Sequence, residues 1–291
     1  MVMVAQMEPS IVGACHSPLV TALLSRTGGF AVSPGWHHGD MCGRYAVTID
    51  PALLAAEIDA VDETATSAVQ SPTIPNYNVA PTDPVLAVVA RHHQPGDVPT
   101  RRIRAMRWGL VPNWATARQD GRPESKGAPL INARAETLTT AATFRAAAQS
   151  KRCLVPMDGW YEWRKQEGAK TAFYMNAGEG KRLFAAGLWS VWKPAKGAVP
   201  LLSCTIVTTD AVGPLREIHD RMPLMLGADS WDSWLDPDRE LDPGLLRAPG
   251  SAAGIETRRV SSLVNSVANN GPELLVPDDG AAAVGEQITL L

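Results

Sequence analysis

Short runs of apolar residues separated by polar turns dominate the chain beyond about residue 75. The first run, residues 85–90, follows an Asn-, Pro- and Thr-rich segment at residues 76–82 that predicts a turn. A second run, residues 103–110, follows the polar segment His-His-Gln-Pro-Gly-Asp at residues 92–97. Apolar runs of about 4–8 residues between turn signals are typical of buried strands, so these two predict a hairpin. Further strands are expected at residues 153–156, 172–175, 183–191, 201–208 and 258–264.

Helical patterns are fewer. Asp50 and Pro51 precede an alanine- and leucine-rich stretch, which predicts a capped helix over residues 51–56 because proline is favoured at the first helical position. Many short strands with few helices indicate an α+β fold. We expect a single domain with a mainly antiparallel, barrel-like β core flanked by short helices. The other helices are expected at residues 135–148, near residues 212–218 and near residues 229–235.

Residues 1–40 differ in composition from the remainder of the chain. They contain one basic residue, Arg26, two acidic residues, Glu8 and Asp40, and three of the six histidines. There is no basic segment at the start, and Glu8 interrupts the apolar beginning, so a secretory signal is not indicated. We expect residues 1–40 to be a disordered extension or the result of a mis-assigned start.

Composition and charge narrow the classes of function. With 45% hydrophobic residues, the chain can bury a sizeable core. A net charge of −3 argues against a general polyanion binder but permits a local basic groove. Four widely spaced cysteines without a Cys-x-x-Cys pair favour a reducing cytoplasm over a disulfide framework or a zinc site. No apolar run is long enough to span a membrane, and no metal or other cofactor is indicated.

The chemistry of the chain centres on Cys42, which follows Met41. A methionine before a small residue resembles an initiator methionine, and its removal would leave Cys42 with both a thiol and a free α-amine. The α-amine has a reference pKa of about 7.7–8.0, so it is more reactive near neutral pH than a lysine. Amine and thiol together can capture an aldehyde, first as a Schiff base and then as a thiazolidine ring. The alternative is an ordinary buried cysteine in a strand.

Three other polar motifs are candidates for function. Glu162 lies between aromatic residues and could act as a general acid or base, or it could be an exposed strand residue. His219 lies beside Asp220 and is a candidate proton shuttle, or a histidine hydrogen-bonded for structure. Asn132 and Arg134 come just before an expected helix, where they could hold a phosphate or sugar oxygen or serve as a helix cap and a surface residue.

Taken together, these motifs resemble the SRAP (SOS-response-associated peptidase) family, whose vertebrate members recognise abasic sites in single-stranded DNA. The resemblance covers the chain from about Met41 to its C-terminus, so residues 41–291 would be the catalytic domain. The departure is the extension of residues 1–40, because an attached extension turns the nitrogen of Cys42 into an amide and prevents Schiff-base formation. The matching motifs are Met41-Cys42-Gly43-Arg44-Tyr45, Asn78-Val79-Ala80-Pro81-Thr82, Arg107-Trp108-Gly109-Leu110-Val111-Pro112, Asn132-Ala133-Arg134-Ala135-Glu136-Thr137, Asp158-Gly159-Trp160-Tyr161-Glu162-Trp163 and His219-Asp220-Arg221-Met222-Pro223.

The resemblance implies a role for each matching residue. Cys42 would link covalently to the ring-opened sugar of an abasic site, and Asn132 would fix the cysteine and the sugar. Glu162 would transfer protons during Schiff-base formation, and His219 would assist ring opening and reversal of the link. Trp114 could stack a base beside the lesion. Phosphate ligands and other members of the DNA groove would be Arg44, Arg134, Arg221, Arg145, Pro81 and Thr208.

The sequence leaves three functions open. The first is covalent capture of abasic sites in single-stranded DNA by a cytoplasmic monomer that associates with the nucleoid when bound to DNA. The second is a thiol or N-terminal-nucleophile peptidase, with Cys42 activated by His219 and residues 1–41 as its natural substrate. The third is a non-catalytic binding module, which would account for the arginines but not for the cysteine, glutamate and histidine.

Overall fold

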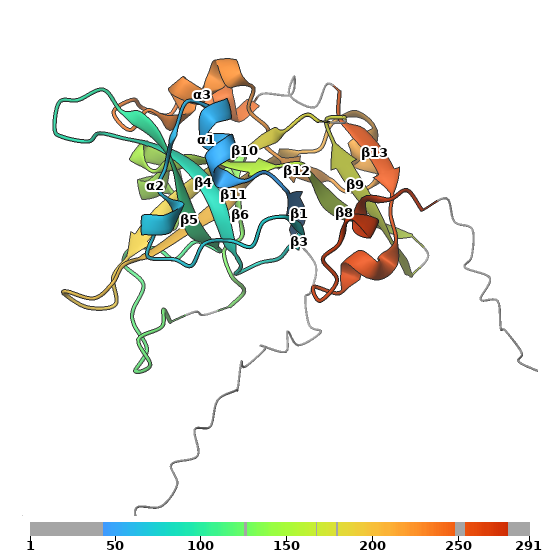
Figure 1. Ribbon diagram of the computed structural model, residues 1–291, viewed down its shortest axis with the longest axis horizontal. Helices are drawn as coiled ribbons and strands as arrows, with labels where there is room; N and C mark the ends of the chain where they lie inside the picture. Colours follow the sequence, from blue (N-terminus) through green and yellow to red (C-terminus); the bar gives the residue numbers. More distant parts are fainter. Residues whose placement is uncertain (1–42, 125–126, 167, 179, 248–253, 279–291) are drawn as a thin grey trace, which may run out of the picture. The chain divides into compact units, whose positions relative to one another are not determined.

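The computed structural model describes residues 43–124, 127–166, 168–178, 180–247 and 254–278. These residues belong to one compact unit. Two β-sheets form its framework, and the helices are short (Figure 1). The fold is therefore α+β, as expected. In the part of the chain that the structure describes, no helix is long and apolar enough to cross a membrane.

A closed ring of five strands forms the centre of the fold. Four antiparallel pairings connect β5 to β4, β4 to β7, β7 to β10 and β10 to β11. A short parallel pairing between β11 and β5 then closes the ring. The prediction of a mainly antiparallel, barrel-like core is confirmed. The strands are β4 (Pro84–Arg91), β5 (Thr100–Trp108), β7 (Arg152–Met157), β10 (Leu183–Trp192) and β11 (Leu201–Asp210).

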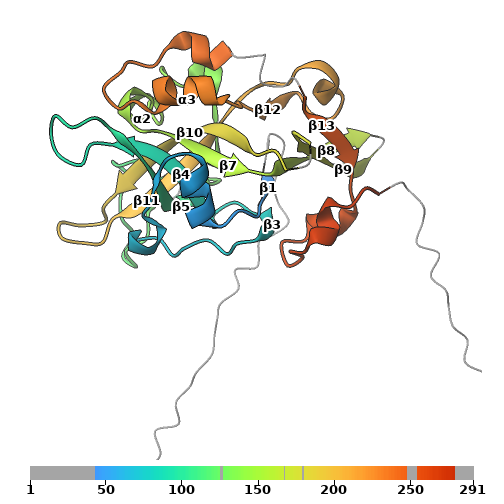
Figure 2. The same ribbon diagram turned by 45° about the horizontal axis from the view of Figure 1, so that its top comes forward.

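Side chains of the barrel strands alternate between its interior and its exterior, as the period of two in a β-strand requires. In β4, Val85, Ala87 and Val89 join the interior cluster, whereas Leu86 and Val88 join a second cluster outside. The outer cluster packs beneath short helices that cover this surface (Figure 2). These helices are α1 (Pro51–Glu57), α2 (Arg145–Ser150) and α3 (Ala228–Leu235).

The second sheet has five strands and packs against one end of the barrel. Its order is β13–β9–β8–β1–β3, and every pairing is antiparallel. Tyr45 of β1 packs edge-on against Trp108 of β5, with ring centroids 5.3 Å apart, so an aromatic contact connects the two sheets. The strands are β1 (Arg44–Val47), β3 (Asn76–Val79), β8 (Gly159–Gln166), β9 (Ala169–Asn176) and β13 (Glu256–Arg259).

Short elements complete the unit. Strand β2 pairs with β5, whereas β6 and β12 both pair with β11. The remaining turns are 3₁₀ helices. These elements are β2 (Val61–Asp62), β6 (Asn132–Arg134), β12 (Arg221–Pro223), η1 (Thr64–Thr66), η2 (Ala135–Thr137), η3 (Gly213–Glu217), η4 (Pro243–Arg247), η6 (Ser262–Asn265) and η7 (Pro272–Leu275).

Three local predictions were wrong. The helix expected over residues 135–148 is present only at its two ends, as η2 and α2. Threonines interrupt it, because a β-branched side chain disfavours the helix and its hydroxyl competes for backbone groups; the Thr140 hydroxyl donates to the Thr137 carbonyl. The turn expected at residues 76–79 is strand β3, and the last strand ends at Arg259, ahead of η6.

Asn78 of β3 holds the C-terminal segment against the second sheet. Its side chain is 3% exposed, and its amide nitrogen donates to the carbonyls of Val264, Ser266 and Asn269. Its amide oxygen accepts a hydrogen bond from Arg44 at 2.9 Å. The Asn78 amide therefore helps to hold this segment, together with hydrogen bonds that Arg44, Tyr77 and Trp163 donate to it.

We expect Asn78→Ala to lower the free energy of unfolding by about 1–3 kcal/mol, because it leaves buried partners without hydrogen bonds. Urea unfolding of this variant and of Asn113→Ala measures the effect. Asn113 is exposed in the loop after β5, so its removal should change stability little. Equal midpoints for both variants and the wild type would show that Asn78 does not hold the C-terminal segment.

Candidate active site

Polar residues from three elements meet at one end of the barrel. Strand β6 runs parallel to β11, so that Asn132 lies opposite Ile206 and Arg134 lies opposite Thr208. Asn132 is partly buried, whereas Arg134 is exposed where β6 leads into η2. The structure thus brings Thr208 beside Asn132 and Arg134, from which it is separated by more than 70 residues in sequence.

Glu162 lies on β8 and is 2% exposed, so it is a buried carboxylate and not an exposed strand residue. Strand β8 pairs with β1, with Arg44 opposite Tyr161 and Tyr45 opposite Trp160. Glu162 follows Tyr161 on β8, so it is the next residue after the Arg44–Tyr161 pair at which β1 begins. Residues 1–42 lie outside the described residues, and Arg44, two residues after Cys42, is thus paired with the residue that precedes Glu162.

His219 lies between η3 and β12 and is half-buried. Its Nδ1 accepts a hydrogen bond from the backbone N–H of Arg221 at 3.0 Å, and Asp220 lies 2.9 Å from the same nitrogen. Burial lowers the pKa of His219 below its ordinary value; Asp220 opposes this effect, and Lys165 of β8 adds to it. The lowered pKa favours the neutral ring, in which Nδ1 either accepts from the Arg221 N–H or carries the proton and donates to Asp220.

Aromatic packing connects the Glu162 side of the site to the Asn132 side. Tyr45, next to Arg44 on β1, contacts Trp108. The indole N–H of Trp108 donates to the carbonyl of Ile131, at 3.0 Å, and Ile131 immediately precedes Asn132. All three apolar residues belong to the barrel's interior cluster. The relative position of the two polar groups is therefore fixed by the core.

Arg221 has its guanidinium committed inside the protein. It donates to both oxygens of Glu136, to Asp210 and to the carbonyl of Thr208. The hydrogen bond from Arg221 lowers the pKa of Glu136, more than burial raises it. Four of the five N–H groups of Arg221 are thus used by contacts that join η2, β11 and β12.

Arg44 is also anchored by the protein. Its guanidinium donates to the Asn78 side chain and to the carbonyls of Val264 and Asn265, at 2.9, 2.8 and 3.4 Å. Burial lowers the pKa of Arg44, and the carboxylate of Asp83 opposes that shift. These contacts use three of its five N–H groups, so the guanidinium is fixed in direction while two donors remain.

The remaining candidates differ in accessibility. Trp114 is 67% exposed in the loop after β5, and Arg145 is exposed at the start of α2. Pro81 is partly exposed in the turn between β3 and β4. Thr208 is fully buried, at 0% exposure, and its carbonyl accepts from Arg221. Trp114, Arg145 and Pro81 can therefore be reached by a ligand directly, whereas Thr208 acts on the surface only through its neighbours.

A family model described as SOS response associated peptidase (SRAP) matches residues 41–267, well over half of the chain. The chain belongs to the SRAP family. The match includes all the candidate residues above and confirms the resemblance on which their roles rest.

Curated relatives of this SRAP protein carry a common name. It is 41% identical over 206 residues to the abasic site processing protein YoaM of Bacillus subtilis, covering 69% of this chain and 84% of YoaM. It is 32% identical over 229 residues to the abasic site processing protein HMCES of Gallus gallus, covering 70% of this chain and 66% of HMCES. A crystal structure of a protein from Bacteroides thetaiotaomicron has the same fold, with a TM-score of 0.67 at 20% identity, over 81% of this chain and all of that one.

The structure adds residues to the SRAP site that sequence reasoning did not single out. Asn78 orients Arg44, and Asp83 accepts from the backbone N–H of Ala80 while lying close enough to Arg44 to affect its pKa. Burial raises the pKa of Asp83, with the Ala80 hydrogen bond and Arg44 opposing it. Asn78 is the first residue of the motif at residues 78–82, and its membership of that motif was the one sequence signal for a role in the site.

Neither cysteine in the described part of the SRAP chain is suited to be a nucleophile. Cys153 and Cys204 are free and 0% exposed, inside the barrel. Burial raises the pKa of both thiols, that of Cys204 to about 12. A thiol reacts as its thiolate, so these two are inert near neutral pH. Among the described residues there is also no cluster of His, Cys, Asp or Glu that could hold a metal ion.

Proposed function

We propose that this protein processes abasic sites in single-stranded DNA and does so by covalent capture through Cys42. The observation that carries the proposal is the position of Glu162, a buried carboxylate next to Tyr161, which pairs with Arg44 at the start of β1. Its relatives YoaM and HMCES are both named abasic site processing proteins. Residues 41–291 are the catalytic domain in this proposal, and the family match that begins at residue 41 supports it.

The chemistry requires Cys42 to be the first residue of the active chain, through initiation at Met41 or through processing. An abasic sugar is in equilibrium with its ring-opened aldehyde. The α-amine of Cys42 adds to the aldehyde carbon, and loss of one water gives a Schiff base. The thiol then adds to the same carbon, and its proton passes to the nitrogen, which closes a thiazolidine. The net reaction joins protein and DNA with release of one water.

The residues around this position divide the proton transfers. Glu162 accepts a proton from the attacking amine and returns it to the departing hydroxyl, since it is buried on the strand that pairs with β1, which begins two residues after Cys42. His219, as a neutral base, removes the proton from the sugar hydroxyl when the ring opens. Asn132, partly buried at the start of β6, holds the sugar through its amide.

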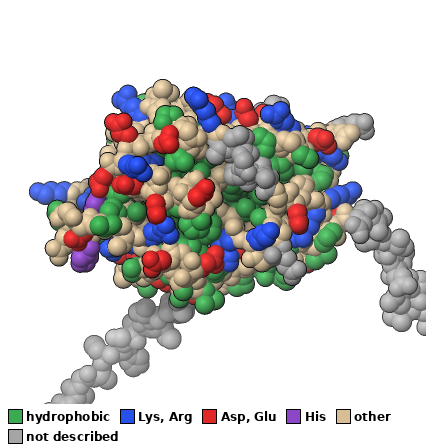
Figure 3. Space-filling view, turned by 90° about the horizontal axis from the view of Figure 1, so that it is seen from above, with side chains coloured by type: hydrophobic (Ala, Val, Ile, Leu, Met, Phe, Trp, Pro, Cys, Tyr) green, Lys and Arg blue, Asp and Glu red, His purple; other side chains and the backbone are tan. Residues whose placement is uncertain are grey.

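DNA binding in this proposal is local. On the face seen in Figure 3, acidic and basic side chains are interspersed without a large region of one sign, and the chain has a net charge of −3. Arg134 and Arg145 are exposed and can contact phosphates, and Trp114 can stack on a base. We assign Arg221 a positioning role, because Glu136 and Asp210 already neutralise it.

Arg134→Ala should weaken binding to single-stranded DNA of any sequence and leave the melting temperature unchanged. It should also reduce the dependence on salt by one phosphate contact, a change of about 0.7 in the log–log slope. Arg221→Ala should instead lower the melting temperature, because it leaves Glu136 and Asp210 without their shared partner. Fluorescence titrations at several salt concentrations, with thermal unfolding of each variant, measure both effects. The assignment fails if Arg221→Ala weakens DNA binding at full stability or Arg134→Ala has no effect.

Adduct formation should slow as the α-amine of Cys42 is protonated below its pKa of about 7.7–8.0, and the further slowing caused by protonation of His219 should begin only below pH 6.5. The reason is that burial lowers the pKa of His219, so its neutral, proton-accepting form persists to lower pH. His219→Ala should slow the reaction and remove this second titration from the acid limb of the pH–rate profile, leaving the titration of the α-amine. Single-turnover rates between pH 5 and 8 measure it. An acid limb that is unchanged in His219→Ala would assign that titration to another group.

A substrate comparison tests the function directly. The chain beginning at Cys42 is incubated with two single-stranded oligonucleotides of the same sequence, one with an abasic position and one without it. Heat-stable adducts are then quantified on a denaturing gel. The proposal expects adducts with the abasic strand alone. Cleavage of a peptide that matches residues 30–50, without any DNA adduct, would favour the peptidase instead.

A further inference from the structure

A cavity of about 340 Å³ opens at the other end of the barrel from the candidate active site. Strand β4 connects the two regions, because Pro84 at its start lies opposite Arg107 and Arg91 at its end lines the cavity. At ~3.3 Å per residue the strand separates them by roughly 23 Å. The mouths of β-barrels are common positions for ligand sites.

Three arginines point into this mouth. Arg91 has the same strand parity as Val89, and Arg102 and Arg104 have the same parity as Met106; Val89 and Met106 belong to the interior cluster. All three arginines line the cavity. Arg101, on the alternate face of β5, instead donates to the carbonyl of Ile58 and to Asp232 outside the barrel.

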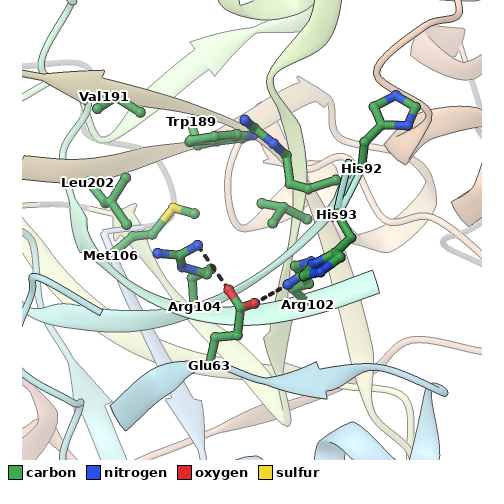
Figure 4. Close-up of a pocket in the computed structure, with 11 residues that line it drawn as sticks. Glu63, His92, His93, Arg102, Arg104, Met106, Trp189, Val191 and Leu202 are labelled. Atoms are coloured by element: carbon green, nitrogen blue, oxygen red, sulfur yellow. Dashed lines mark hydrogen bonds and ion pairs between the residues drawn. The ribbon is translucent and has the colours of Figure 1, made fainter. Parts of the chain in front are cut away.

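The charge in this mouth is not balanced. Glu63 accepts hydrogen bonds from Arg102 and from Arg104 (Figure 4). The exposed fraction is 17% for the Arg102 side chain, 30% for that of Arg104 and 18% for that of Glu63. The Nε atoms of Arg102 and Arg104 are buried and have no hydrogen-bond partner among the described residues. With Arg91, three guanidinium groups face one carboxylate. Arg91 is exposed, whereas Arg102 and Arg104 are partly buried, and these three arginines exceed the one carboxylate by two positive charges. A concave site with such an excess of positive charge favours an anionic ligand.

The remaining walls suit a flat or apolar body attached to that anion. The guanidinium of Arg91 lies over the ring of Trp189, 5.1 Å from its centroid, so its outer face is a flat platform. Met106, Val191 and Leu202 form an apolar side of the cavity (Figure 4). Guanidinium planes stack well on nucleobases, and apolar side chains pack against a base or sugar.

We propose that this mouth binds a nucleotide through its terminal phosphate monoester. A phosphate monoester carries a charge of about −1.5 to −2 near neutral pH, which matches the two unbalanced positive charges. A carboxylate or a phosphodiester carries one charge and would leave one guanidinium uncompensated. Arg102 and Arg104 hold the phosphate beside Glu63, and Arg91 stacks on the base. The nucleotide is either free or the phosphorylated end of a DNA strand.

Calorimetry with the chain beginning at Cys42 tests the proposal with three probes: a deoxynucleoside 5′-monophosphate, its methyl phosphate ester and the deoxynucleoside. The monophosphate should bind, the ester should bind about tenfold more weakly, as expected for the loss of one charge-assisted contact, and the nucleoside should not bind. Undamaged oligonucleotides with a 5′-phosphate or a 5′-hydroxyl then show whether the site binds free nucleotides or the phosphorylated end of a DNA strand. A phosphate-dependent gain in affinity assigns the site to strand ends, and equal affinities assign it to free nucleotides.

Arg91→Gln is the informative variant, since the Arg91 side chain has no hydrogen bond or ion pair among the described residues and can be replaced without unfolding the barrel. It should weaken monophosphate binding at least about tenfold. Arg101→Gln removes the same charge from the outer face and should leave binding unchanged. The proposal is wrong if no binding of the monophosphate is measurable at millimolar concentration, if the ester binds equally well, or if both variants behave alike. None of these results bears on the proposed function at the other end of the barrel.

Discussion

Glu162→Gln should slow formation of the DNA adduct by about 10²–10⁴-fold, the usual contribution of a positioned general acid or base. Glutamine keeps the size of the side chain and can still form hydrogen bonds within β8, but it cannot exchange a proton at the pH of the reaction. Because Glu162 is buried and the substitution removes none of the exposed arginines that would contact phosphates, affinity for single-stranded DNA should not change. Single-turnover kinetics with abasic strands at saturating protein give the rate, and a binding titration with undamaged strands gives the affinity.

Glu217→Gln is the matched control for this experiment. Glu217 ends η3, is exposed, and lies two residues before His219, so the substitution makes the same chemical change near the site without touching a buried group. It should react like the wild type. If Glu162→Gln reacts at the wild-type rate, or if both variants are equally slow, the assignment of proton transfer to Glu162 is wrong.

Cys42→Ala, in a chain that begins at residue 42, should lose the heat-stable adduct while still forming a product that borohydride traps. Alanine keeps the free α-amine, which can form a Schiff base, but it lacks the thiol that closes the thiazolidine. Borohydride reduces the Schiff base to a stable secondary amine. Denaturing gels of reactions run with and without borohydride separate the two steps.

A chain with one glycine added before Cys42 provides the complementary control. It retains the thiol and converts the nitrogen of Cys42 into an amide, while its new α-amine is displaced from the thiol. This chain should give no heat-stable adduct. A thiol peptidase predicts the opposite pattern, because for that enzyme Cys42→Ala would abolish all covalent chemistry and borohydride would trap nothing.

The barrel could be predicted because its strands have apolar side chains on both faces. Residues of β4 such as Val85 and Leu86 are buried on opposite sides, one inside the barrel and one beneath the helices, which produces a continuous apolar run. Strand β8 was not predicted, since aromatic, acidic and basic residues alternate in it. Its pairing with β1 joins residues more than 110 positions apart in sequence, which no local pattern reveals.

The candidate site was proposed from sequence motifs, but the motifs did not show which of its charged side chains are paired or buried inside the protein. The sequence placed Arg221 beside His219 and suggested a phosphate ligand, whereas Glu136, 85 residues away, is its partner in the fold. Burial of Glu162 likewise follows from sheet pairing and from the packing of Tyr45 against Trp108. Non-local contacts decide which arginines can face a ligand, and these contacts exist only in the folded chain.

The intact mass of the product formed with an abasic single strand tests the central proposal most directly. A chain beginning at Cys42 should give, without any reductant, one new species whose mass is the sum of protein and oligonucleotide minus one water. Digestion of that species should place the DNA on the peptide that begins with Cys42. The absence of any adduct, with or without borohydride, or an adduct placed on another residue, would contradict the proposal.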